Sequence, residues 1–96
     1  MNYVLFFPDE LRAKNLSCYG HPTIRTPSFD RLSLEGVTFE SCYVQNPVCS
    51  PSRCCLFTGT YVHTLGHRTL WNLLKPYEHN MLETFKQAGY QVRVYG

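Results

Sequence analysis

The sequence has no long hydrophobic run and no strong excess of one charge. No stretch reaches the ~18 consecutive apolar residues that a membrane-spanning helix requires, so no transmembrane segment is expected within it. Nine Lys and Arg against seven Asp and Glu leave a formal net charge of +2, and the basic residues are scattered rather than clustered. This pattern argues against a nucleic-acid-binding surface. The 96 residues accommodate at most one small domain.

The start of the sequence has no features of a secretory signal. Met1 and Asn2 lead directly into the apolar residues 3–7, with neither a basic segment nor a small-residue cleavage site. A cytoplasmic location is therefore the default expectation. Export is the alternative if a leader precedes this sequence.

The cysteines, at positions 18, 42, 49, 54 and 55, include no Cys-x-x-Cys pair. An odd number cannot pair completely, and the adjacent Cys54 and Cys55 are poorly placed to bridge each other. The spacing also argues against a four-ligand zinc site. We expect four of the cysteines to be small buried thiols in a reducing compartment, with Cys49 as the exception.

Two histidines, His63 and His67, are four residues apart, a spacing that on a helix would suit a metal ion. Gly66 lies between them, and the glutamate of a His-Glu-x-x-His motif is missing. We therefore interpret both as ordinary loop histidines.

The composition and hydrophobic patterns predict an α/β fold. Hydrophobic residues make up 44% of the sequence and aromatic residues 15%, which is typical of a packed core. Residues 3–7, 37–44 and 90–95 have the apolar or alternating patterns of strands. Because predicted helices separate them, we expect a parallel sheet with right-handed crossovers.

Two helices are predicted in the first 60 residues. Thr26 is a suitable N-cap with Pro27 at the first helical position, and Gly36 predicts the end of that helix. Residues 51–58 predict a second helix, which begins with a proline and stops at Gly59.

The segment before the last strand carries a further helix signal. A short helical turn is expected at residues 70–74. Asn80 then predicts an N-cap, with Glu83 three residues later as its capping-box partner. Gly89 predicts the end of this helix.

The chemistry of the chain is concentrated at Cys-Ser-Pro-Ser-Arg, residues 49–53. Cys49 precedes a predicted helix, so free backbone N–H groups and the helix dipole favour an anion there, either a thiolate or a bound sulfate or phosphate. Arg53, one turn later, adds a fixed cation, and together they form half of a site for an oxyanion ester. The Cys-x5-Arg loop of cysteine phosphatases is absent, because Cys55 stands at the arginine position.

The pentapeptide resembles the sulfatase motif at each position that the formylglycine-generating enzyme reads, namely Cys49, Pro51 and Arg53. The resemblance implies the alkaline-phosphatase-like α/β fold and oxidation of Cys49 to formylglycine. In that family one hydroxyl of the hydrated aldehyde attacks sulfur and displaces the alcohol. Loss of a proton from the second hydroxyl then expels sulfate. By the same resemblance, Arg53 stabilises the charged form of the nucleophile.

Two consecutive carboxylates, Asp9 and Glu10, follow the first predicted strand. The carboxyl end of a parallel strand is where α/β folds place their sites, and a hard divalent cation prefers several oxygen ligands. In sulfatases two aspartates at this point bind the cation. Asp9 matches the first and Glu10 replaces the second. The resemblance therefore implies a site for Ca²⁺, or another divalent cation such as Mg²⁺, with Asp9, Glu10 and the modified Cys49 as ligands.

The resemblance covers nearly the whole chain. Further matches include residues 18–22, 26–32, 36–39 and 57–61. Residues 89–96 are similar to the opening of the family's second signature, in which a catalytic lysine follows the equivalent of Gly96. Residues 1–96 are therefore identified as the N-terminal part of a sulfatase domain, a single partial domain.

This assignment implies hydrolysis of a sulfated small molecule or carbohydrate, with the formylglycine-generating enzyme as a maturation partner. Two alternatives stay open. One is a phosphonate or phosphate ester hydrolase of the same superfamily, since such a site accepts tetrahedral anions. The other is a catalytically inactive fragment or assembly partner, and we expect the isolated polypeptide to be poorly soluble or molten because its sheet would lack covering layers.

Overall fold

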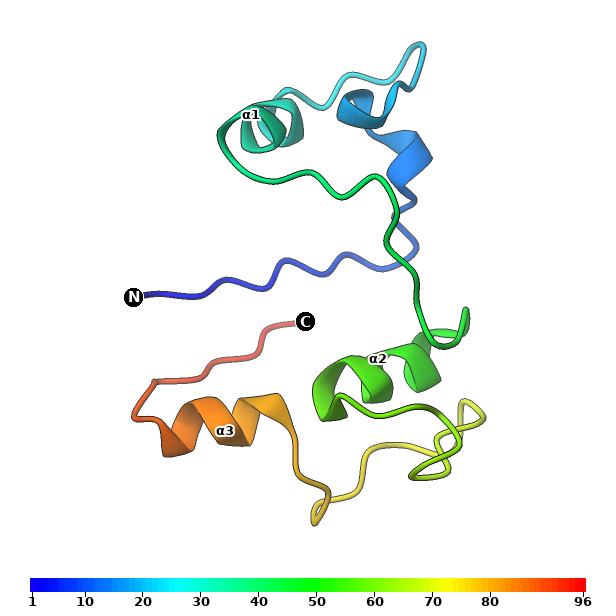
Figure 1. Cartoon of the computed structure of the whole chain (residues 1–96), viewed down its shortest axis with the longest axis vertical. Helices are drawn as coiled ribbons and strands as arrows, with labels where there is room; N and C mark the ends of the chain where they lie inside the picture. The colour runs from blue at the N-terminus through cyan, green and yellow to red at the C-terminus, as the bar shows by residue number, and fades with distance from the viewer. The chain divides into compact units, whose positions relative to one another are not determined.

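The computed structural model describes all 96 residues and consists of short helices joined by turns and extended segments. The helices, in chain order, are the 3₁₀-helices η1 (Ala13–Asn15) and η2 (Ser17–Tyr19) and the α-helices α1 (Pro27–Glu35), α2 (Cys49–Thr58) and α3 (Met81–Gln87) (Figure 1). None of them is long and apolar enough to cross a membrane. The chain divides into two compact units, Met1–Ser41 and Cys42–Gly96.

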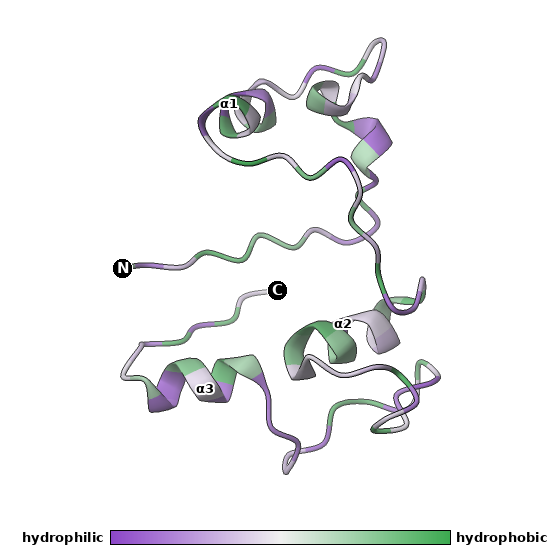
Figure 2. Ribbon diagram, viewed as in Figure 1, coloured by the Kyte–Doolittle hydropathy of each residue, from purple (hydrophilic) through white to green (hydrophobic).

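The prediction of a parallel sheet is wrong, because the structure contains no strand. Residues 3–7, 37–44 and 90–95 carry the predicted apolar patterns but have no ladder partner. Val4 is 91% exposed and Tyr95 83%, and Figure 2 shows hydrophobic residues along the extended N-terminal segment. A two-sided apolar strand is stable only when neighbouring strands pair with its backbone and other layers cover its faces. The chain provides neither, so these three segments stay extended and the predicted α/β fold does not form.

The helix α1 begins as predicted, with Pro27 at its first position. Thr26 is the N-cap residue, but its side chain makes no capping hydrogen bond. Instead its Oγ1 accepts from the backbone N–H of Ser17 at 3.0 Å. The Ser17 hydroxyl lies 2.7 and 2.8 Å from the two carboxylate oxygens of Asp30, and the Thr26 N–H donates to that hydroxyl at 2.8 Å. This polar cluster joins η2 to α1.

The first unit has little buried apolar surface. Leu16 is its one buried hydrophobic residue, at 8% exposure. Around it, the ring centroids of Phe6 and Phe29 are 6.2 Å apart, and the Tyr19 hydroxyl donates to the carbonyl of Phe39 at 2.9 Å. These contacts keep residues far apart in sequence together without a large core.

The helix α3 confirms the predicted start at Asn80. The Asn80 side chain accepts a hydrogen bond from the backbone N–H of Glu83 at 3.2 Å. The carboxylate of Glu83 lies 3.4 Å from His79 Nδ1, so it pairs with this neighbour. Gly89, with φ of +86°, follows the helix in the left-handed region. The short helical turn predicted at residues 70–74 does not form.

Candidate functional site

The helix α2 carries Cys49 as its first residue, two positions earlier than predicted. Val48 is the N-cap, with extended backbone and no side-chain cap. Pro51 lies in the first turn, where its missing N–H costs no helical hydrogen bond. Gly59 ends the helix as predicted, with φ of +68° and its N–H donating to the Cys55 carbonyl at 2.8 Å. Local sequence signals therefore position the cysteine at a helix N-terminus.

The two sides of α2 differ in burial. Pro51, Cys54 and Cys55 are its buried residues. Cys49 is exposed, and Arg53, four residues later, is half-buried. Residues four apart on a helix are neighbours on one face. The helix is thus held through one face and presents Cys49 and Arg53 on another.

The surroundings of Cys49 favour negative charge. The first N–H groups of a helix have no intrahelical acceptor, and the dipole places partial positive charge at this end. The guanidinium on the same face adds a full positive charge with donors that match a tetrahedral oxyanion. The arrangement can therefore hold an oxyanion beside a nucleophile at residue 49.

Asp9 and Glu10 lie in the turn before η1, in the first unit, and both are exposed. Glu10 has φ of +54° and is the one non-glycine residue in the left-handed region, a conformation that costs energy for a glutamate. The chain holds no group of three or more His, Cys, Asp or Glu side chains suited to a metal ion. Two carboxylates supply at most four of the roughly six to eight oxygens that Ca²⁺ takes. They therefore fit part of a cation's donor set but do not form a complete site.

The other thiols depart in part from the sequence prediction. All five cysteines are free. Cys54 and Cys55 are buried as expected, but Cys18 is half-buried and Cys42 is exposed, so the expectation of four buried thiols is wrong for these two. Cys18 lies in η2, and Cys42 lies in the segment 37–44, which was predicted to be a strand but has no covering layer.

The thiol of Cys54 has a raised pKa. Burial raises its pKa above the usual value. A hydrogen bond from the Leu74 backbone lowers this pKa, whereas negative charge on Cys55 and Glu78 raises it further. The net increase in pKa favours the neutral form of the Cys54 thiol.

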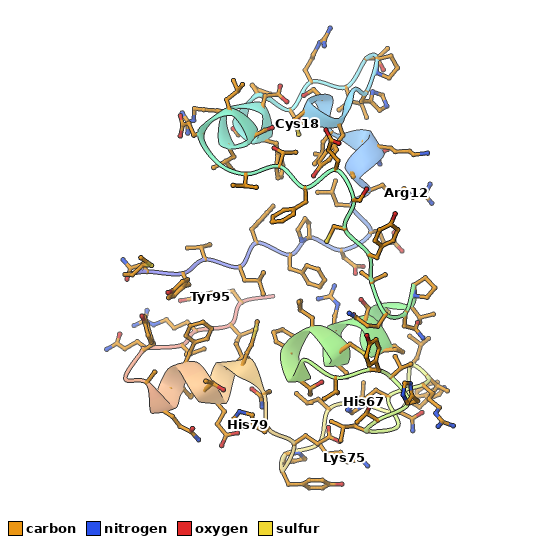
Figure 3. All side chains as sticks on the ribbon, viewed as in Figure 1. Arg12, Cys18, His67, Lys75, His79 and Tyr95 are labelled. Carbon is orange, nitrogen blue, oxygen red and sulfur yellow. The ribbon has the colours of Figure 1, made fainter.

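His67 lies in a loop, as predicted, but its side chain is buried and paired. Its side chain is 1% exposed and that of Glu78 5%, and the two meet with 3.0 Å between Nε2 and Oε2. The Nδ1 atom lies 2.7 Å from the carbonyl of Asn72, in the loop between α2 and α3 where Figure 3 labels His67. These partners have no helical or strand spacing, so no sequence signal pairs them.

An open cavity of about 650 Å³ is lined by residues that include Thr58, Lys75 and Glu78. Thr58 is the last residue of α2, so it lies roughly 13 Å along the helix axis from Cys49. The cavity is therefore at the other end of the helix from the candidate nucleophile and is not part of this site.

Comparison with known proteins agrees with the family that the pentapeptide at residues 49–53 indicates. The sulfatase family model matches residues 1–96. The chain is 33% identical to an N-acetylglucosamine-6-O-sulfatase of Bacteroides thetaiotaomicron over 95 residues, which are 99% of this chain and 17% of that protein. It is 36% identical to an N-acetylgalactosamine-6-sulfatase of Sus scrofa over 110 residues, covering 99% of this chain and 21% of that protein. It is 47% identical to arylsulfatase A of Homo sapiens over 65 residues, covering 68% of this chain and 13% of that protein.

No solved structure matches the chain significantly. The chain spans only about a fifth of the length of these curated relatives, 17% and 21% for the first two. The family model matches residues 1–96, and the first two relatives each align with 99% of the chain. The chain therefore belongs to the sulfatase family.

Proposed function

We propose that this chain is part of a hydrolase of sulfate esters in which Cys49, oxidised to formylglycine, is the nucleophile. The observation that carries the proposal is the placement of Cys49, exposed at the first position of α2, with Arg53 one turn later. The chain belongs to the sulfatase family, so hydrolysis of a sulfate ester is the reaction that we propose.

Each residue of the pair has a distinct role. Residue 49 holds the reacting atom at the positive end of the helix, where the backbone N–H groups stabilise negative charge. The guanidinium of Arg53 stabilises the charged nucleophile and orients the sulfate oxygens. The formylglycine supplies an aldehyde hydrate, whose oxygen can attack sulfur and whose second hydroxyl allows sulfate to leave.

Asp9 and Glu10 are proposed ligands of a divalent cation, Ca²⁺ or Mg²⁺, together with the modified side chain of residue 49. Such a cation would neutralise charge on the sulfate group. Because two carboxylates are too few oxygens for this ion, the remaining ligands are proposed to come from a longer polypeptide.

The substrate class we propose is a sulfated carbohydrate or sulfated small molecule. Two of the relatives are named for sulfated amino sugars. The proposed maturation partner is the formylglycine-generating enzyme, which would read Cys49, Pro51 and Arg53. We keep a cytoplasmic location as the default proposal and export as the alternative.

The test uses the full-length protein that carries this sequence, co-expressed with the formylglycine-generating enzyme. Peptide mass spectrometry should show the thiol of Cys49 replaced by an aldehyde, and turnover of 4-nitrophenyl sulfate should exceed that of its phosphate analogue. Cys49→Ala should abolish both signals, whereas Cys42→Ala, which alters another exposed cysteine, should retain them. An unmodified Cys49 in soluble, co-expressed protein would refute the proposal, and a preference for the phosphate would favour a phosphate ester hydrolase.

A further inference from the structure

The segment between α2 and α3, residues 59–80, has no helix or strand of its own. Three of its polar contacts involve the side chain of His67 or Glu78. The Lys75 backbone N–H donates to Glu78 Oε2 at 2.8 Å, His67 Nδ1 lies 2.7 Å from the Asn72 carbonyl, and His67 Nε2 lies 3.0 Å from Glu78 Oε2. The last contact joins residues 11 positions apart and is the most buried of the three.

The partners of His67 determine where its protons lie. A carbonyl oxygen only accepts hydrogen bonds, so Nδ1 must donate to Asn72. The Nε2 atom is buried and lacks a partner in hydrogen-bond orientation, although Glu78 Oε2 is only 3.0 Å away. Because the two side chains are only 1% and 5% exposed, they contact each other out of reach of solvent. Losing either partner would leave the other polar group buried and uncompensated.

This pair lies next to the buried face of α2. The Leu74 backbone donates a hydrogen bond to the Cys54 thiol, and the charge of Glu78 is close enough to raise the pKa of that thiol. Cys54 shares the buried face with Pro51. The loop that contains the pair therefore covers the face of α2 that does not carry Cys49.

We propose that the buried contact between His67 and Glu78 closes residues 59–80 over α2 and thereby positions Cys49. They are positioning residues, since neither reaches the reacting atom itself. The buried pair fixes the loop, and the loop packs against the face of α2 that contains Cys54. The opposite face of α2 then presents Cys49 and Arg53. The effect on Cys49 rests on the proposed function, whereas the closure of the loop does not.

The first measurement is the alkylation rate of Cys54 relative to the exposed Cys42, followed at one pH by mass spectrometry of the full-length protein. His67→Gln and Glu78→Gln should each raise this ratio about tenfold, because either change leaves a buried polar group unpaired and opens the loop. The double variant should not exceed the single ones, as expected for two residues that act as a pair. His63→Gln, an exposed histidine four residues away, should leave the ratio unchanged. An unchanged ratio in the single variants, or a double variant that multiplies their effects, would overturn the pairing.

The second measurement separates positioning from the proposed reaction. At equal formylglycine content, His67→Gln should lower kcat for 4-nitrophenyl sulfate about tenfold with little change in KM, because a displaced nucleophile affects the reaction more than substrate binding. Equal kcat values for wild type and His67→Gln, or a change confined to KM, would overturn the positioning role. An inactive wild type with modified Cys49 would instead refute the proposed function, while the alkylation ratio still decides whether the pair closes the loop.

Discussion

Arg53 lies one helical turn after Cys49 on α2, and neither belongs to the buried face of that helix, which is formed by Pro51, Cys54 and Cys55. The same ten residues thus provide a packed side and a reactive side. Because the buried side chains are small, the helix can be held close to the adjoining loop without covering its N-terminal end. This division explains how so short a helix can both pack and present a nucleophile.

Because the guanidinium of Arg53 is proposed to orient the sulfate, activity should depend strongly on the shape of the side chain at residue 53. Arg53→Lys keeps the charge but loses the planar pair of donors, so kcat for an aryl sulfate should fall about 10²-fold. Kinetics on protein with equal formylglycine content measures this. Arg68→Lys, an exposed arginine in the same unit, serves as the matched control and should behave as wild type. Equal activity of Arg53→Lys and wild type would contradict the assigned role.

Asp9 is predicted to be a cation ligand in the full-length protein. Asp9→Asn should weaken binding of Ca²⁺ or Mg²⁺ at least ~10-fold, because an amide oxygen lacks the charge of a carboxylate. Isothermal titration calorimetry of the metal alone provides the measurement. Glu35→Gln removes a carboxylate from the exposed ion pair with Arg31 and should not affect binding. Equal affinities for Asp9→Asn and wild type would remove Asp9 from the site.

The raised pKa of Cys54 predicts a loss of stability at alkaline pH. In the unfolded chain this thiol ionises near its ordinary value of about 8.5, whereas burial keeps it protonated in the folded state. Its contribution is complete below that pH, and stability falls as the pH rises from there through the folded-state pKa. Denaturant midpoints at neutral and alkaline pH should show a smaller loss for Cys54→Ala than for wild type. The same alkaline loss in both proteins would assign it to other groups.

Substitution of Gly59, at the end of α2, should lower stability through the backbone conformation of this residue. Its φ of +68° lies in the left-handed region, and a Cβ there would meet no atom within 4 Å. Gly59→Ala should therefore cost about 1 kcal/mol through conformation alone. Gly59→Asn should cost less, because asparagine tolerates this region. Denaturant midpoints of the two variants test the order, and equal losses would argue against a conformational cause.

The isolated polypeptide is predicted to melt without a sharp transition. Leu34 is 87% exposed and Trp71 90%, and the buried hydrophobic residues are only Leu16, Cys54 and Cys55. So little burial leaves the entropy of ordering the chain largely uncompensated. Calorimetry and binding of an apolar dye to the 96-residue chain provide the measurement. A cooperative transition from a monomer that binds no dye would contradict this expectation.

The helix boundaries and the family follow from residues that are close together in the chain. The start of α1 at Pro27, the end of α2 at Gly59 and the cap of α3 at Asn80 each depend on a few neighbouring residues. Such signals act through local backbone geometry and hydrogen bonding, so they can be read without knowing what packs nearby. The pentapeptide at residues 49–53 is equally local, and its assignment to sulfatases was confirmed.

The strands, the thiols and His67 show the opposite case, since their states depend on distant partners. The apolar residues 3–7 and 90–95 favour strands, but a strand exists only when another segment pairs with its backbone. Cys42 and Cys54 are the same residue type, and only packing makes one exposed and the other buried. The burial of His67 against Glu78 likewise comes from the folding of a loop whose spacing has no period. These features are non-local, so they arise only when the chain adopts its three-dimensional arrangement.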